Sequence, residues 1–95
     1  MAVRDRKPTS PGKILQEEFL KPMNLTQKFL AQHLGCDIKV INRIVNEKTA
    51  VTAEMALKLA SALQTSPDFW LNAQKAMDLY WARAEGMKLP VPIRL

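Results

Sequence analysis

The stretch formed by residues 26–46 strongly limits the folds open to this chain, because it can hold two short helices and only a tight turn between them. Thr26 is a residue type that caps helix N-termini, and apolar residues follow it at helical spacing. Gly35 stands where a helix favours a left-handed residue after its last turn. Asp37 is again an N-cap residue, and a second apolar row begins after it. We therefore predict two helices joined by a turn of about three residues, which is a helix-turn-helix arrangement.

Three further helices are expected from the same kinds of signal. Ser10 and Ser66 are N-cap residues, and each precedes a proline that suits the first helical position. Thr52 precedes an apolar stripe with helical spacing, formed by Met55, Ala56, Leu59, Ala60 and Leu63. In no stretch do apolar and polar residues alternate long enough to predict a strand. The sequence therefore predicts an all-α fold with five helices, over about residues 11–21, 27–34, 38–46, 53–63 and 67–85.

The chain is expected to form one domain, because 95 residues, of which 47% are hydrophobic, suffice for a single modest core. Residues 1–9 are polar and basic without periodicity, so we expect a flexible basic arm. Residues 10–85 are expected to form the helical domain. Residues 86–95 contain two prolines and are expected to form an extended tail.

A cytoplasmic location without a membrane partner is expected. The apolar runs are too short to span a bilayer, and the N-terminal residues include no apolar signal core. Cys36 is the single cysteine, so it cannot form an internal disulfide, which fits a reducing compartment.

Residues suited to catalysis or to metal binding are few and scattered. His33 is the only histidine and has no acidic partner in its pattern, and Cys36 lacks further metal ligands. No glycine-rich loop that could bind a phosphate occurs. We therefore expect a protein that is not an enzyme and that needs no metal and no cofactor.

The net charge of +5 is concentrated in the first half of the chain. Residues 1–48 carry nine basic and five acidic side chains, whereas residues 49–95 carry five basic and four acidic ones. A cluster of positive charge favours a polyanionic partner, because each neutralised phosphate releases counterions. Charge alone is weak evidence, since many proteins have basic faces that bind nothing.

The second helix of a helix-turn-helix enters the major groove of DNA. The side chains opposite its apolar row of Ile41 and Ile44 are expected to read bases, and they are Ile38, Lys39, Asn42 and Arg43. Arginine can bond two acceptors of guanine, and asparagine can bond adenine in the same bidentate way. Phosphate contacts are expected from flanking residues, namely Gln27, Lys28, Asn46, Lys48 and Thr49. The alternative interpretation of this face is a solvated basic surface without a partner.

Residues 25–64 resemble the lambda-repressor-like, Xre-type helix-turn-helix family. The resemblance rests on Leu25-Thr26-Gln27-Lys28, Leu30-Ala31, Leu34-Gly35, Ile41, Ile44, Asn46, Lys48, Ala56-Leu57-Lys58-Leu59-Ala60 and Ala62-Leu63. The flanks are more specific, because Ser10-Pro11-Gly12-Lys13-Ile14-Leu15 and Ser66-Pro67-Asp68-Phe69-Trp70-Leu71-Asn72 resemble the HigA antitoxins of bacterial toxin–antitoxin modules. Glu47 departs from the pattern, since relatives often have glycine there.

This resemblance implies a five-helix, dimeric antitoxin that binds operator DNA and represses its own operon. It also implies a protein partner, a HigB-type toxin that cleaves mRNA. Two other functions remain open at this point. One is a solitary Xre-type repressor without a toxin, and the other is a protein-interaction module that has lost DNA binding.

A homodimer is expected because one recognition helix per chain reads only half of a palindromic site. The fifth helix has more apolar surface than one core contact needs. We expect its interface side chains to be Trp70, Met77, Tyr80 and Trp81, with the tail contributing. The alternative is a long core helix in which Trp81 is half exposed.

Overall fold

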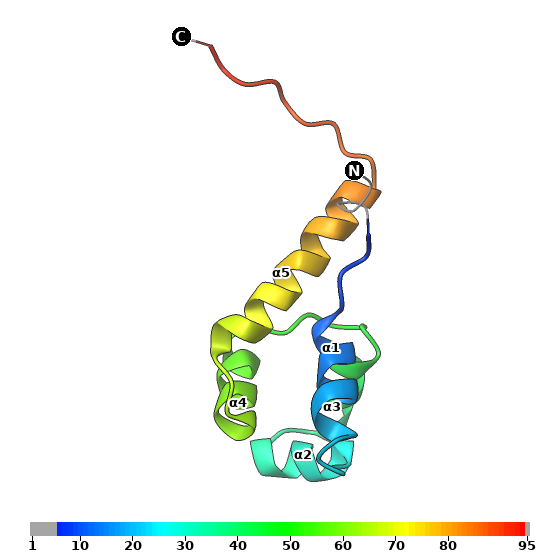
Figure 1. Cartoon of the computed structure of the whole chain (residues 1–95), viewed down its shortest axis with the longest axis vertical. Coiled ribbons are helices and arrows are strands. Elements are labelled where there is room, and N and C mark those ends of the chain that lie inside the picture. Colours follow the sequence, from blue (N-terminus) through cyan, green and yellow to red (C-terminus); the bar gives the residue numbers. More distant parts are fainter. Residues whose placement is uncertain (1–5, 95) are drawn as a thin grey trace.

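The structure is a computed structural model that describes residues 6–94, and these residues form helices and no strand. The first helix begins as α1 at Pro11–Ile14 and continues as the π-helix η2 at Leu15–Leu20. The others are α2 at Gln27–Leu34, α3 at Ile38–Val45, α4 at Ala53–Leu63 and α5 at Pro67–Ala84 (Figure 1). The predicted all-α class and helix order are confirmed, with α1 and η2 together forming the first expected helix. None of these helices is long and apolar enough to cross a membrane.

All five predicted N-cap side chains accept a hydrogen bond from a backbone N–H in the first turn of their helices. The donor–acceptor distances lie between 2.8 and 3.2 Å for Ser10, Thr26, Asp37, Thr52 and Ser66. At the other end of α2, Gly35 adopts the predicted left-handed conformation, with φ of 76°. Local capping chemistry therefore determines where these helices begin and where α2 ends.

The π-helix η2 was not predicted. In its last turn the Lys21 N–H donates to the Gln16 carbonyl oxygen at 3.0 Å, five residues earlier. The wider turn brings residues five apart to the same side of the helix. Leu15 and Leu20 are consequently both buried in the core.

The core is centred on Trp70, which lies in the first turns of α5. Its ring centroid is 5.5 Å from that of Phe19, and its Nε1–H donates to Thr65 Oγ1 at 2.7 Å. The other buried hydrophobic residues that cluster with it are Leu15, Leu20, Leu30, Ala31, Ile41, Ile44, Val51, Met55, Ala56, Leu59, Ala60 and Leu63.

The expected dimer residues on α5 require a correction. Trp70 and Met77 are 0% and 4% exposed within the single chain, so they cannot contact a second copy. Trp81 lies on the same side of the helix, because residues seven and eleven positions apart are nearly aligned in an α-helix. That side faces the core in the first half of α5 and leaves it in the second half, where Trp81 is 49% exposed.

The second half of α5 and the tail project beyond the helical body, which gives the described residues a length of 54 Å (Figure 1). At the start of the chain, Lys7 Nζ lies 5.3 Å from the centre of the Trp81 ring. Residues 1–5 of the predicted arm and Leu95 lie outside the described residues.

Candidate DNA-binding surface

The turn between α2 and α3 positions the predicted recognition helix. The N–H of Cys36 donates to the Ala31 carbonyl oxygen at 2.9 Å, and the N–H of Gly35 donates to Gln32 at 3.2 Å. Both bonds satisfy carbonyl groups at the end of α2. On α3, Ile41 and Ile44 are 0% and 3% exposed, so the predicted inward row is confirmed.

The opposite side of α3 faces solvent. The four side chains predicted to read bases are all exposed there, and they are Ile38, Lys39, Asn42 and Arg43. Within residues 6–94 no ion pair involves Lys39 or Arg43. This side of α3 therefore combines two unpaired cations with an amide, while contact with bases remains a prediction.

Asn42 links α3 to the start of α2. Its Nδ2–H donates to Gln27 Oε1 at 3.2 Å, and its Oδ1 accepts from Asn46 Nδ2 at 3.2 Å. Asn46 Nδ2 also lies 3.0 Å from the Asn42 carbonyl oxygen. The three amides form one chain across the surface, which restricts the rotamers of Asn42 before any ligand binds.

The other predicted phosphate-binding residues surround this chain. Lys28 lies exposed in the first turn of α2, and Lys48 and Thr49 lie exposed in the loop after α3. The loop begins with a bond from the Lys48 N–H to the Arg43 carbonyl oxygen at 2.8 Å. No ion pair within the described residues involves Lys28 or Lys48.

Gln74 on α5 fixes the far end of this loop, and the sequence reasoning missed it. Its Oε1 accepts the Val51 N–H at 2.9 Å, and its Nε2–H donates to Asp78 Oδ1 at 3.0 Å. The bond to Val51 joins residues 23 positions apart in the chain. A polar side chain in the apolar stripe between Trp70 and Met77 was the signal that could have revealed it.

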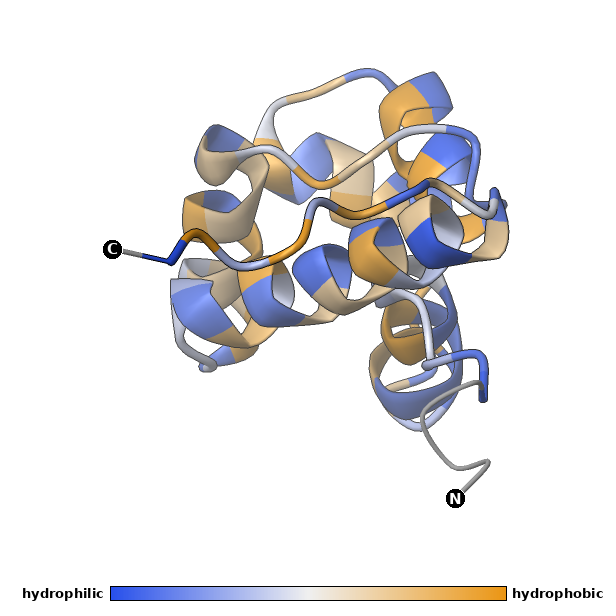
Figure 2. Cartoon of the chain, turned by 90° about the horizontal axis from the view of Figure 1, so that it is seen from above, coloured by the Kyte–Doolittle hydropathy of each residue, from blue (hydrophilic) through white to orange (hydrophobic). Residues whose placement is uncertain are grey.

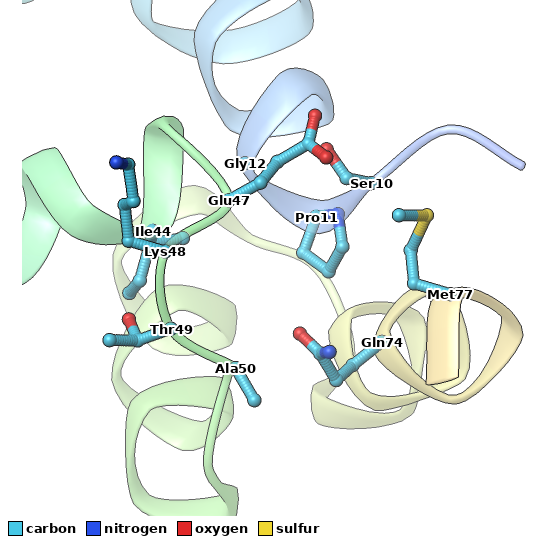
Figure 3. Close-up of a pocket in the computed structure, with 10 residues that line it drawn as sticks. All are labelled: Ser10, Pro11, Gly12, Ile44, Glu47, Lys48, Thr49, Ala50, Gln74 and Met77. Atoms are coloured by element: carbon cyan, nitrogen blue, oxygen red, sulfur yellow. The ribbon is translucent and has the colours of Figure 1, made fainter. Parts of the chain in front are cut away.

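Three segments meet around a cavity of about 170 Å³ beside this loop (Figure 3). Gly12 packs so closely on α3 that a Cβ would collide with the carbonyl oxygen of Ile44. Glu47 has a left-handed backbone with φ of 59°, a conformation that glycine adopts without the steric cost of a side chain. Its carboxylate lies 3.5 Å from Lys7 Nζ. In Figure 3 Lys48 points away from the cavity, so it is available at the outer surface.

Comparison with known proteins matches residues 17–70 to the helix-turn-helix family HTH_3. An uncharacterised HTH-type transcriptional regulator of Haemophilus influenzae is 51% identical over 75 residues, which are 79% of this chain and 70% of the relative. Antitoxin HigA-1 of Vibrio cholerae is 44% identical over 78 residues, which are 82% of this chain and 73% of the relative.

Among solved structures, the Pseudomonas aeruginosa antitoxin HigA with the higBA promoter superimposes with a TM-score of 0.81 at 35% identity. The match covers 84% of this chain and 87% of that one. These similarities confirm the predicted fold and the resemblance to HigA antitoxins. They also confirm the prediction that the chain is a DNA-binding protein rather than an enzyme.

Proposed function

Because this chain belongs to the helix-turn-helix family HTH_3, we propose that it is a HigA-type antitoxin that represses its own operon and neutralises a HigB-type toxin. The part of this proposal that concerns DNA binding rests on the outer side of α3. Lys39, Asn42 and Arg43 are exposed there, opposite two buried isoleucines that fix the rotation of the helix. An exposed side with these groups matches the donors and acceptors of base edges.

In the proposed complex, α3 lies in the major groove. Arg43 donates two hydrogen bonds to a guanine, and Asn42 contacts an adenine. Gln27 Oε1 accepts from Asn42, and this bond orients the Gln27 amide so that its Nε2–H donates to a phosphate. Lys28, Lys48 and Thr49 contact the flanking backbone, which sets the orientation of α3 in the groove.

We propose a homodimer as the DNA-binding species. A single α3 reads one half-site, and a two-fold axis brings the second α3 to the next turn of the duplex. The exposed apolar residues in the second half of α5 support an interface there, with Leu79 and Trp81 at its centre and Tyr80 beside them. We propose that this dimer acts in the cytoplasm, where it binds operator DNA.

DNA binding is tested with a fluorescent duplex from the region upstream of the chain's own gene. Anisotropy titrations should give much tighter binding to this duplex than to a shuffled one. Asn42→Ala should lower the affinity for the operator and leave binding to shuffled DNA unchanged. Equal affinity of the wild-type protein for both duplexes would contradict the proposal.

Neutralisation of a toxin is supported by the relatives named as HigA antitoxins. The Haemophilus influenzae relative is described only as a transcriptional regulator, which favours a solitary repressor as the alternative function. Coexpression with the product of the neighbouring gene separates the two. An antitoxin should copurify with that product and restore the growth of cells that produce it, whereas a solitary repressor should do neither.

A further inference from the structure

An acidic residue stands in the loop that is proposed to contact phosphates. Glu47 directly precedes Lys48 and Thr49, which are expected to bind the DNA backbone. A carboxylate close to a phosphate weakens binding, because like charges repel each other. DNA binding through this loop therefore requires that the charge of Glu47 is directed away from the duplex or neutralised.

Lys7 supplies the opposite charge for Glu47. The Glu47 side chain turns toward the segment that holds Ser10, whereas Lys48 points away from the cavity (Figure 3). On that side the Glu47 carboxylate lies 3.5 Å from Lys7 Nζ. Both side chains are partly exposed to water, so this ion pair by itself adds little stability to the fold. Its consequence is the direction in which the carboxylate is held.

A second contact holds Lys7 in place. Its Nζ lies 5.3 Å from the centre of the Trp81 ring on α5, where the face of the ring attracts a cation. Three residues after Lys7, Ser10 is buried and caps α1, which limits how far the Lys7 backbone can move. One ammonium group therefore joins the loop after α3 to the second half of α5.

The segment before α1 lies between the helical body and α5. It runs from α1 toward the second half of α5 in Figure 1, and its first described residues are hydrophilic in Figure 2. On α5 it forms a crevice lined by Arg6, Pro8, Ala76, Leu79, Tyr80 and Arg83. A second crevice is lined by Lys7, Pro8, Thr9, Ser10, Lys13 and Glu47. Contacts with both neighbours therefore define the position of this segment.

The loop after α3 is consequently tied to α5 at both of its ends. At its far end the Val51 N–H donates directly to Gln74 Oε1 at 2.9 Å. At its near end Glu47 is connected through Lys7 to Trp81. Gln74 and Trp81 are seven positions apart, so they lie on the same side of α5. The residues between these two ends are the ones expected to contact phosphates.

We propose that Lys7 is a positioning residue for DNA binding, which holds the Glu47 carboxylate away from the phosphates that Lys48 and Thr49 contact. This inference rests on the proposed DNA-binding function and adds to it a residue outside the helix-turn-helix. Without Lys7 the carboxylate is free to rotate toward the outer surface, where salt screens it from a phosphate only beyond about 8–10 Å. Phosphates carry no sequence information, so operator and shuffled DNA should be affected alike.

A double-mutant cycle on the full chain tests this role by anisotropy titration at low salt. Lys7→Met removes the charge, and we expect it to lower the affinity for both duplexes by about three- to tenfold, as estimated for one unpaired charge near a phosphate. Glu47→Gln should leave the wild-type affinity nearly unchanged, because Lys7 already neutralises that carboxylate. In the Lys7→Met protein the same substitution should restore most of the loss. Lys7→Arg should bind as the wild-type protein does, since a guanidinium also pairs with a carboxylate and stacks on an aromatic ring.

Lys13→Met is the matched control, because it removes the same charge from the same crevice. Lys13 is exposed, and no ion pair within residues 6–94 involves it. Glu47→Gln should therefore raise the affinity much less in the Lys13→Met protein than in the Lys7→Met protein. An equal gain in both would overturn the inference, because Lys7 would then act only through net charge.

A loss in Lys7→Met that Glu47→Gln does not restore would also overturn the inference, since Lys7 would then act through Trp81 alone. The proposed function fails in a different way, which is equal affinity of the wild-type protein for operator and shuffled DNA. The cycle can be measured on either duplex, so the two failures are distinguishable.

Discussion

Asn42 occupies the centre of the proposed recognition surface, and its hydrogen bonds leave one donor and one acceptor available for a base. An asparagine amide has two N–H donors and an oxygen with two lone pairs. One donor goes to Gln27, and one lone pair receives the donor of Asn46. The remaining donor and lone pair are the two groups that adenine recognition requires. The internal bonds therefore orient Asn42 without using up its capacity for DNA.

Arg43→Ala should weaken operator binding by about 1–3 kcal/mol, because it removes a bidentate base contact from an exposed position. Binding to shuffled DNA should change much less. Anisotropy titrations over a series of salt concentrations measure both affinities.

Lys48→Ala is the matched control for Arg43→Ala. It should weaken binding to operator and shuffled DNA alike. The number of counterions released on binding, measured by the slope of log affinity against log salt concentration, should fall by about one, as expected for a phosphate contact. If Arg43→Ala behaves in the same way as Lys48→Ala, then Arg43 binds phosphate and does not read bases.

Gln64→Gly should stabilise the fold. Gln64 follows α4 in a left-handed conformation with φ of 58°, which costs a residue with a side chain roughly 1–2 kcal/mol. Glycine relieves this cost but loses more entropy on folding, so the net gain should be about 0.5–1 kcal/mol. Urea denaturation measures it. Gln64→Ala keeps the unfavourable conformation and should show no such gain, and a Gly variant no more stable than Ala would contradict the argument.

The helices of this fold could be predicted closely, because their ends are marked by local chemistry. Each N-cap and the glycine after α2 act within a few residues, and such signals can be read directly in the sequence. The π-helix η2 could not be predicted, since it arises from the fit of Leu15 and Leu20 into a core built from distant residues.

Contacts between elements were harder to predict than the elements themselves. Trp70 and Met77 were expected at a dimer interface because the helical pattern reveals an apolar side and not what covers it. The four residues that we expect to read bases were predicted on the exposed side of α3, and they lie there, because Ile41 and Ile44 determine which side is buried. Gln74 was missed because its partner lies 23 positions away.

Gln74→Leu should loosen the loop that carries Lys48 and Thr49. The Val51 N–H would lose its acceptor at a buried residue, which costs about 1–3 kcal/mol of stability. Thermal unfolding measures this loss. Binding to operator and to shuffled DNA should also weaken together, because the loop is expected to contact phosphates and not bases.

Asp78→Ala is the control for Gln74→Leu, since it removes the other hydrogen bond of Gln74 and keeps the bond to Val51. It should bind DNA as the wild-type protein does. A Gln74→Leu protein that is destabilised but binds DNA normally would show that the loop needs no support from α5.

The elongated shape of the chain separates two surfaces. Lys39, Asn42 and Arg43 lie on the helical body, whereas the uncovered apolar residues lie on the second half of α5 and on the tail that projects from it. A dimer formed at the projecting end leaves both recognition helices free. Because the contacts of one α3 cover only a few base pairs, tight binding depends on joining two of them.

Trp81→Glu should give a folded monomer with much weaker operator binding. The side chain is 49% exposed and lies near Lys7, so a carboxylate can be tolerated in the single chain. In the proposed interface the same carboxylate would be desolvated without a fixed partner, which disfavours association. Sedimentation measures the oligomeric state, and circular dichroism checks the helix content. Operator half-sites should be about 10 base pairs, or roughly 34 Å, apart from centre to centre, or a multiple of that spacing. A Trp81→Glu protein that remains dimeric would show that the interface does not include this part of α5.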